Sequence, residues 1–304
     1  MLHLRRQSRR FVHLMDTQER QWMYQHVAHR KDASDRLLRM VDARLTRHKP
    51  LQYMLQSQPF CGLDIRIRPP ILIPRCFKCI RIIPVVIYDV PRCRPETAEW
   101  TMSLIQRIQQ SSASRKLRIL DLCTGSGCIA LALAHHCSHA HVDAVDINPR
   151  AVRLGRLNAR RLGIPVSFQT DDLFRSEFHI PANHYDVIVC NPPYISDAEF
   201  QTLERDVREW EDRKALVGSL NQNPDGLRYY HRLLELLPWP RKSRCEVREM
   251  AVHEFSYTKG AVPRLMMEYG GQHQTDALVH LFQAVGPVTV LIDGCDKHRV
   301  LTVM

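Results

Sequence analysis

The tetrapeptide Asn191-Pro192-Pro193-Tyr194 is the stretch whose residue types and spacing say most about chemistry. Two adjacent prolines fix the backbone and remove two N–H donors, so nearby carbonyl groups can point into a cleft as acceptors. The Asn191 side-chain oxygen and the Pro192 carbonyl can hold both hydrogens of an –NH₂ group, and Tyr194 can pack on the flat group that carries it. Since an amide nitrogen is a poor nucleophile, such a site would rely on orientation and desolvation. A rigid turn without chemistry is the competing interpretation.

A second chemical signature lies in the segment Asp121–Gly127, between an apolar strand and an apolar helix. Gly125 and Gly127 allow a ligand to approach the backbone closely, and the start of the helix offers free N–H groups. Asp146 ends the next strand, where an acid accepts hydrogen bonds from ribose hydroxyls. A Gly-x-Gly turn also fits dinucleotide binders, and a turn with only a structural role is about equally compatible with these residues.

The pair Asp172-Leu173 follows the third predicted strand. At the carboxyl end of a strand, Asp172 can meet an adenine amine and Leu173 can cover the face of the ring. A solvated loop is the alternative, and this segment taken alone favours it.

These residues are positioned by strands and helices that alternate from residue 116 onward. Predicted strands occupy 117–122, 141–146, 166–170, 185–191 and 263–269, and predicted helices 128–136, 148–162, 226–237 and 275–285. This alternation predicts a parallel sheet with helices on both faces. Two β-rich runs, 288–292 and 299–303, predict an antiparallel pair that closes a seven-stranded sheet. The position of Asn191 after the fourth strand favours chemistry over a plain turn.

The chain before the sheet divides into a helical part and a connector. Residues 16–56 follow a helical period, and Pro50 ends that region, which predicts a small helical domain, basic on its outer face. Residues 60–75 alternate around Pro69-Pro70, which predicts a hairpin with the prolines at its turn. The predicted units are 1–58, a basic segment with the helical domain; 59–95, the connector; and 96–304, the catalytic domain.

Composition narrows the setting of the protein. The chain has 304 residues and a formal net charge of +11, which favours an acidic partner such as nucleic acid but also suits the mitochondrial matrix. The first fifteen residues are rich in arginine and lack acids, which favours a mitochondrial presequence over a basic first turn. No apolar run is long enough to span a membrane. Cys76 and Cys79 form a lone Cys-x-x-Cys, so we predict no metal site and reduced cysteines.

Taken together, the chain resembles the HemK/PrmC family of protein glutamine methyltransferases, and most closely its mitochondrial fungal members. Asn-Pro-Pro-Tyr alone is shared with DNA adenine methyltransferases, whereas the Pro-Leu-Gln-Tyr and Arg-Pro-Glu-Thr elements and the helical N-terminal domain are more specific. The stretches that carry the resemblance are 49–53, 72–75, 94–97, 121–127, 191–194, 206–208, 215–218 and 268–270.

The resemblance implies an α/β, class I (Rossmann-like) methyltransferase domain that uses S-adenosyl-L-methionine. Its implied substrate is the glutamine amide in the Gly-Gly-Gln loop of a class 1 translation release factor, which the N-terminal helices help to grip. Expected catalytic residues are Asn191, Pro192, Pro193 and Tyr194. Expected cofactor-binding residues are Cys123, Thr124, Gly125, Ser126, Gly127, Asp146, Asp172, Leu173 and Asn191. We expect a monomer, mitochondrial or otherwise cytoplasmic, with no membrane partner and no nucleic-acid substrate.

Two stretches depart from the family pattern. The family runs Leu-Ile-Pro-Arg directly into Pro-Glu-Thr, whereas residues 76–94 intervene here, and residues 241–259 have little family character. We interpret 76–94 as a translated intron or gene-model artefact, since evolved surface loops are usually more polar; a genuine insertion that packs on the N-terminal domain is the alternative. The rival functions are a nucleic-acid adenine amino-methyltransferase and a binding protein whose catalysis the insertions impair.

Overall fold

The computed structural model describes residues 17–74, 96–111, 116–181, 184–219, 225–239, 251–254 and 261–304. The basic first fifteen residues and the segment 76–94 lie outside these residues, as does most of 241–259. The interpretations given for them therefore stay predictions.

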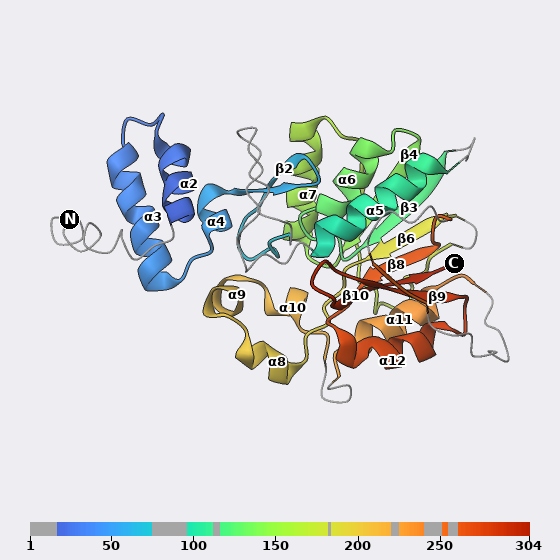
Figure 1. The fold of residues 1–304 in the computed structure, drawn as a ribbon. Coiled ribbons are helices and arrows are strands. Elements are labelled where there is room, and N and C mark those ends of the chain that lie inside the picture. The colour runs from blue at the N-terminus through green and yellow to red at the C-terminus, as the bar shows by residue number, and fades with distance from the viewer. Residues whose placement is uncertain are drawn as a thin grey trace.

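A mixed sheet forms the centre of the molecule (Figure 1). Within the described residues it has eight strands in the order β5-β4-β3-β6-β8-β10-β9-β7. The first five strands in this order run parallel, and β10 runs antiparallel to both of its neighbours. The strands are β3 (Leu117–Leu122), β4 (Ala140–Asp146), β5 (Ser167–Thr170), β6 (Val187–Cys190), β7 (Ala251–Glu254), β8 (Leu265–Glu268), β9 (Val288–Ile292) and β10 (His298–Val303).

Seven of these strands are those that the sequence predicts, and β7 is an addition that it does not. β7 pairs in parallel with β9 and occupies the edge that β9 would otherwise present. An unpaired strand edge offers a row of backbone donors and acceptors, so even a four-residue segment can add to it. So short a strand, in a stretch without sustained alternation, carries little sequence signal.

Helices cover both faces of the sheet (Figure 1). On one face, α5 (Glu96–Gln110), α6 (Cys128–His136) and α7 (Pro149–Leu162) bury Trp100, Ile129 and their neighbours against the strands. On the other, α11 (Arg228–Leu236) and α12 (Gln272–Phe282) bury Tyr230, Phe282 and their neighbours. The short helices α8 (Asp197–Thr202), α9 (Arg205–Trp210) and α10 (Arg213–Leu216) follow β6.

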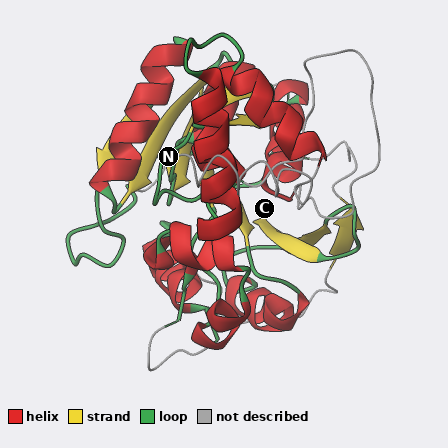
Figure 2. Cartoon of the chain, turned by 90° about the vertical axis from the view of Figure 1, so that its left-hand side faces the viewer, coloured by secondary structure: helices red, strands yellow, loops and turns green. Residues whose placement is uncertain are grey.

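The predicted N-terminal helical region is three helices, α2 (Thr17–Val27), α3 (Ala33–Arg47) and α4 (Leu51–Leu55), which lie in front of the strands in Figure 2. Met23, Val41 and Leu51 are among the buried residues that hold them together. The prediction that Pro50 ends the helical region is wrong, because Pro50 precedes α4, where the fixed φ of proline suits the start of a helix. The Trp210 indole donates to the Arg47 carbonyl at 2.8 Å, which ties α3 to α9.

The connector does contain a hairpin, but the predicted turn is wrong. Strands β1 (Ser57–Phe60) and β2 (Leu63–Arg66) meet at Cys61 and Gly62, whose φ values are +47° and +82°. Tight hairpin turns favour positive φ, which proline cannot adopt because its ring holds φ near −65°. The prolines at 69 and 70 therefore follow β2, joined by a cis peptide bond.

The strand order reverses between β3 and β6. From β3 the chain moves outward to β4 and β5, then returns to place β6 on the other side of β3. In open α/β sheets, ligands bind at the carboxyl ends of the strands beside such a switch point. The fold therefore predicts a site at the ends of β3, β4 and β6.

Candidate functional site

Three predicted site residues meet at this switch point. Cys123 follows Leu122, the last residue of β3, which pairs with Val145 in β4 and with Cys190 in β6. Asp146 and Asn191 come directly after these two partners. Residues far apart in the sequence therefore lie on adjacent strand ends, as the alternation of strands and helices predicts.

The turn after β3 is held open by positive φ angles at Cys123, Gly125 and Gly127, of +59°, +57° and +83°. A Cβ at Gly127 would lie 2.9 Å from the Phe168 ring, so only glycine fits this packing. At Gly125 a Cβ would meet nothing within 4 Å, which leaves that side of the turn open for a ligand. The positive φ at Cys123 is sparsely populated for a residue with a side chain and marks a constrained position.

The side chains inside this turn face the protein. The Thr124 hydroxyl donates to Asp121 at 2.6 Å, and the Ala130 amide donates to the same oxygen at 3.2 Å. Asp121 is fully buried, and this burial raises its pKa to about 7. Ser126 is also buried, and its carbonyl accepts from Asn158. The Ser126 hydroxyl has no hydrogen-bond partner among the described residues, whereas the Thr124 hydroxyl is occupied by Asp121.

The carboxylate of Asp146 is organised by two backbone amides. Gly125 donates to one oxygen and Asn148 to the other, each at 2.8 Å. Burial raises the pKa of this carboxyl group, against the lowering effect of the two amides. A carboxylate can accept about four hydrogen bonds, so each oxygen retains a free acceptor position. Two adjacent acceptors match the two neighbouring hydroxyls of a ribose.

In the turn after β5, the groups of Asp172 and Leu173 form hydrogen bonds within the protein. Asp172 accepts from the Phe174 amide at 2.9 Å, within its own turn. Leu173 is partly buried against the core, and its carbonyl accepts from Arg232 at 2.6 Å. The contacts with adenine that the sequence suggests for Asp172 and Leu173 stay predictions.

Tyr229, at the start of α11, lies near the predicted site, and the sequence alone does not reveal this. Its ring meets the Phe174 ring edge to face, with centroids 5.2 Å apart. Burial raises the pKa of its hydroxyl to about 12, and the nearby Cys123, Asp172 and Asp146 add to that effect. Tyr229 therefore faces the turns that follow β3, β4 and β5. From the sequence alone, two adjacent tyrosines at the start of a helix are interpreted as residues of the hydrophobic core.

Asn191 has the features of a ligand-binding side chain. It is half-buried, and among the residues that the structure describes it has no hydrogen-bond partner. The buried Pro192 and Pro193 likewise accept no hydrogen bond from any described residue. A side-chain amide and proline carbonyls without partners leave acceptors available, as the sequence analysis expects for this tetrapeptide.

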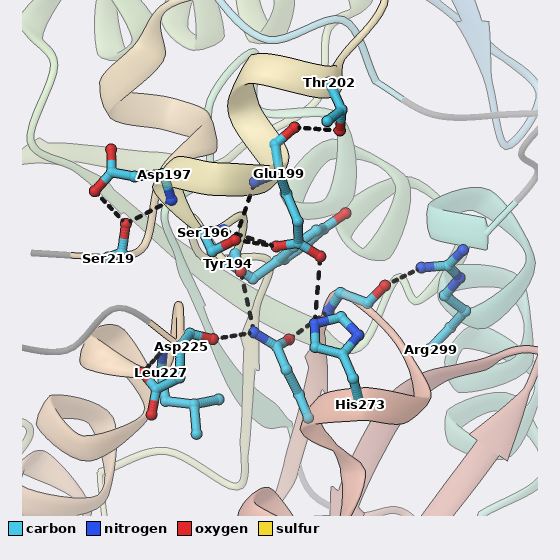
Figure 3. Close-up of polar contacts among 12 residues, drawn as sticks. Tyr194, Ser196, Asp197, Glu199, Thr202, Ser219, Asp225, Leu227, His273 and Arg299 are labelled. Carbon is cyan, nitrogen blue, oxygen red and sulfur yellow. Dashed lines mark hydrogen bonds and ion pairs between the residues drawn. The ribbon is translucent and has the colours of Figure 1, made fainter.

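The backbone that follows is held from two sides. Gln274 on α12 donates to the carbonyls of Tyr194 and Asp225, at 3.1 and 2.8 Å, and accepts from Gly270 (Figure 3). A Cβ at Gly226, which has φ +77°, would lie 2.2 Å from the Tyr194 carbonyl oxygen, and a Cβ at Gly218 would lie 2.2 Å from that of Pro193. Close backbone packing thus fixes the tetrapeptide.

The Cys123 thiol lies beside that of Cys190, under the same site. The hydrogen bond with Cys190 and then burial raise the pKa of the Cys123 thiol well above its usual value. A neutral thiol is a weak nucleophile, so the geometry does not favour covalent catalysis by cysteine. Within the described residues, no group of His, Cys, Asp or Glu is arranged to hold a metal ion.

Comparisons with known proteins agree with this geometry. The family model of the methyltransferase small domain matches residues 98–209. The chain is 36% identical over 193 residues to a release factor glutamine methyltransferase of Bacteroides thetaiotaomicron, covering 64% of this chain and 59% of that protein. It is 34% identical over 192 residues to the mitochondrial MRF1 N(5)-glutamine methyltransferase MTQ1 of Saccharomyces cerevisiae, covering 61% and 55%.

The resemblance to the HemK/PrmC family is confirmed. A release factor glutamine methyltransferase of Bacillus subtilis adds 33% identity over 213 residues, with 70% of this chain and 64% of that protein covered. The chain thus spans less than two thirds of the length of these relatives.

A solved structure agrees on the fold. The hMettl16 catalytic domain, solved in complex with an RNA hairpin, superimposes with a TM-score of 0.50 at 14% identity, covering 90% of this chain and 82% of that chain. So low an identity supports the fold alone. The seven predicted strands in this order confirm the class I, Rossmann-like methyltransferase fold.

Proposed function

We propose that this chain transfers a methyl group from S-adenosyl-L-methionine to the side-chain amide nitrogen of the glutamine in the Gly-Gly-Gln loop of a class 1 translation release factor. The observation that carries the proposal is Asn191, a half-buried amide that no described residue binds, placed at the switch point on the strand end next to Cys123, with Asp146 on the other side of Cys123. The names of the relatives supply the substrate class.

The residues around the switch point fit this cofactor. The open side of Gly125 leaves room for the cofactor against the backbone, and Asp146 has two acceptors for the ribose hydroxyls. The side chain of Leu173 and the ring of Tyr229 would contact the adenosine portion. When bound, the cofactor supplies an electrophilic methyl group on a sulfonium.

The chemistry assigned to the protein is orientation of the substrate amide. The Asn191 side-chain oxygen and the Pro192 carbonyl would accept the two N–H groups, and the Tyr194 ring would pack on the amide plane. Both acceptors belong to a stretch that the close backbone packing at Gly218 and Gly226 holds in place, so they need little reorganisation. A direct displacement of this kind requires no catalytic nucleophile from the protein.

A methyl-transfer assay with matched substrates tests this proposal. The chain is incubated with labelled cofactor and a release factor, the same release factor with its Gly-Gly-Gln glutamine changed to alanine, or adenine-containing DNA. We expect label in the first substrate alone. Label in DNA instead would favour the adenine methyltransferase. Cofactor binding by calorimetry without transfer to any substrate would favour the impaired binding protein.

We also propose the setting of this activity. The helices α2 to α4 would help to grip the release factor, and the enzyme would act as a monomer. The relation to a mitochondrial yeast protein supports a mitochondrial location. No helix in the described part of the chain is long and apolar enough to cross a membrane. Fractionation of cells that express a C-terminally tagged chain tests the location, and recovery of the tag in the cytosol alone would contradict it.

A further inference from the structure

Glu268, the last residue of β8, is a fully buried acid close to the tetrapeptide. One carboxylate oxygen accepts from the Thr97 hydroxyl at 2.7 Å and from the Trp100 indole at 2.9 Å. The other accepts from the Tyr194 hydroxyl at 3.3 Å. Its backbone carbonyl accepts from the Tyr230 hydroxyl at 2.8 Å. One residue therefore joins the start of α5, the tetrapeptide and α11 to the end of a central strand.

This arrangement is costly for a purely structural residue. Among the described residues, the Glu268 carboxyl group accepts only from neutral donors, and no lysine, arginine or histidine forms an ion pair with it. Burial of an acid without a counter-ion costs several kcal/mol, which neutral hydrogen bonds offset only in part. An apolar side chain at this position would leave the buried Thr97 hydroxyl and Trp100 indole without an acceptor, so the acid and its donors form one unit that reaches the tetrapeptide through Tyr194.

Tyr194 is the partner through which such a role would act. Its backbone carbonyl is held by Gln274 and its hydroxyl by Glu268, so both ends of the residue are fixed. The 3.3 Å distance is longer than usual for a hydroxyl donor. The bond therefore adds little to stability, so its removal should be felt in the orientation of the ring more than in the melting temperature.

We propose that Glu268 is a positioning residue, which holds the Tyr194 ring at the angle needed to pack on the target amide. This inference rests on the proposed methyl transfer. Glu268 acts through Tyr194 and does not contact the reacting atoms. The contacts with Thr97 and Trp100 hold the carboxylate in place, so the start of α5 contributes indirectly to the same alignment.

A pair of matched substitutions separates alignment from stability. Tyr194→Phe removes the hydroxyl bound to the Glu268 carboxylate, and Tyr230→Phe removes the one bound to its backbone carbonyl. We expect Tyr194→Phe to lower kcat about tenfold, with KM and melting temperature little changed, because small misplacements are expensive for catalysis. Tyr230→Phe should lower the melting temperature and leave kcat within about twofold of wild type.

The contact from the side of Glu268 is tested by Glu268→Gln, alone and combined with Tyr194→Phe. Glu268→Gln should lower kcat about as much as Tyr194→Phe. The variant that carries both substitutions should have a kcat within about twofold of either single variant, since both substitutions remove the same contact. A Tyr194→Phe variant with wild-type kcat would overturn the inference. So would a loss of kcat that is in the same proportion to the loss of melting temperature in Tyr194→Phe and in Tyr230→Phe, because it would show that both variants act through stability.

A spectroscopic readout distinguishes this inference from the proposed function. In protein labelled with 3-fluorotyrosine, the Tyr194 fluorine resonance is assigned by its loss in Tyr194→Phe. Glu268→Gln, or Glu268→Asp if the glutamine variant does not fold, should shift or broaden that resonance, whereas Tyr185→Phe, which removes a hydroxyl bound to Asp143 at the opposite end of β6, should not. A wild-type chain that fails to methylate release factors would refute the proposed function alone. An unchanged Tyr194 resonance in the Glu268 variant would refute the positioning role.

Discussion

The carboxylate of Asp146 gives the sharpest test of how the cofactor is held. Its two oxygens already accept from the amides of Gly125 and Asn148, and each keeps one free acceptor position for a ribose hydroxyl. Asp146→Asn keeps the size of the side chain but replaces one acceptor with a donor and removes the charge. The variant therefore loses at least one charge-assisted hydrogen bond to the cofactor, worth about 1.5–3 kcal/mol.

This loss corresponds to a rise in Kd of about tenfold to a hundredfold, which calorimetry with S-adenosylhomocysteine can measure. Asp143→Asn is the matched control, because Asp143 lies earlier on the same strand and contacts Arg118 and Tyr185 instead of the turn. We expect its Kd to stay within about twofold of wild type. An unchanged Kd in Asp146→Asn would show that the acid or the ligand has been assigned wrongly.

Four further predictions follow from the same geometry. Asn191→Ala should lower the rate of methyl transfer about 10²–10³-fold while cofactor affinity measured by calorimetry stays nearly unchanged. Burial raises the pKa of Asp121 from 3.8 to about 7, so the folded state retains a proton that the unfolded state releases. Stability should therefore fall as pH rises from about 4 to 7, by up to roughly 4 kcal/mol, and urea unfolding of Asp121→Asn should show that this slope has gone. Gly226→Ala places a Cβ 2.2 Å from the Tyr194 carbonyl at φ +77°, so both the melting temperature and the transfer rate should fall. Removal of residues 76–94 should increase soluble expression without weakening cofactor binding, and mature transcripts that uniformly encode these residues would contradict the artefact interpretation.

The parts of the fold that the sequence predicts are those with local signals. Apolar strands followed by apolar helices predict every strand of the sheet except β7, and the boundaries of β3 and α6 agree with the structure. The turns after β3 and β6 carry glycines and prolines, whose backbone limits are readable one residue at a time. Because the carboxyl ends of parallel strands lie at one edge of a sheet, the alternation of strands and helices also predicts that Cys123 and Asn191 lie at neighbouring strand ends.

The parts that the sequence does not predict depend on partners far away in the chain. Glu268 reads as the polar end of an apolar strand, and its function as a junction appears only once Thr97 and Tyr194 are placed around it. The sequence predicts the hairpin turn at the prolines because they are strong turn formers, whereas the positive φ at Cys61 has no local signature. Similarly, β7 exists because β9 leaves an edge to pair with.

Mass spectrometry of the release factor in cells tests the central claim most directly. The Gly-Gly-Gln peptide is compared in release factor purified from cells with the gene, without it, and without it but expressing either the wild-type chain or Asn191→Ala. The account predicts a methylated glutamine amide in the first cells, its loss in the second, and its recovery with the wild-type chain but not with Asn191→Ala. Methylation that persists undiminished in cells lacking the gene would contradict the account.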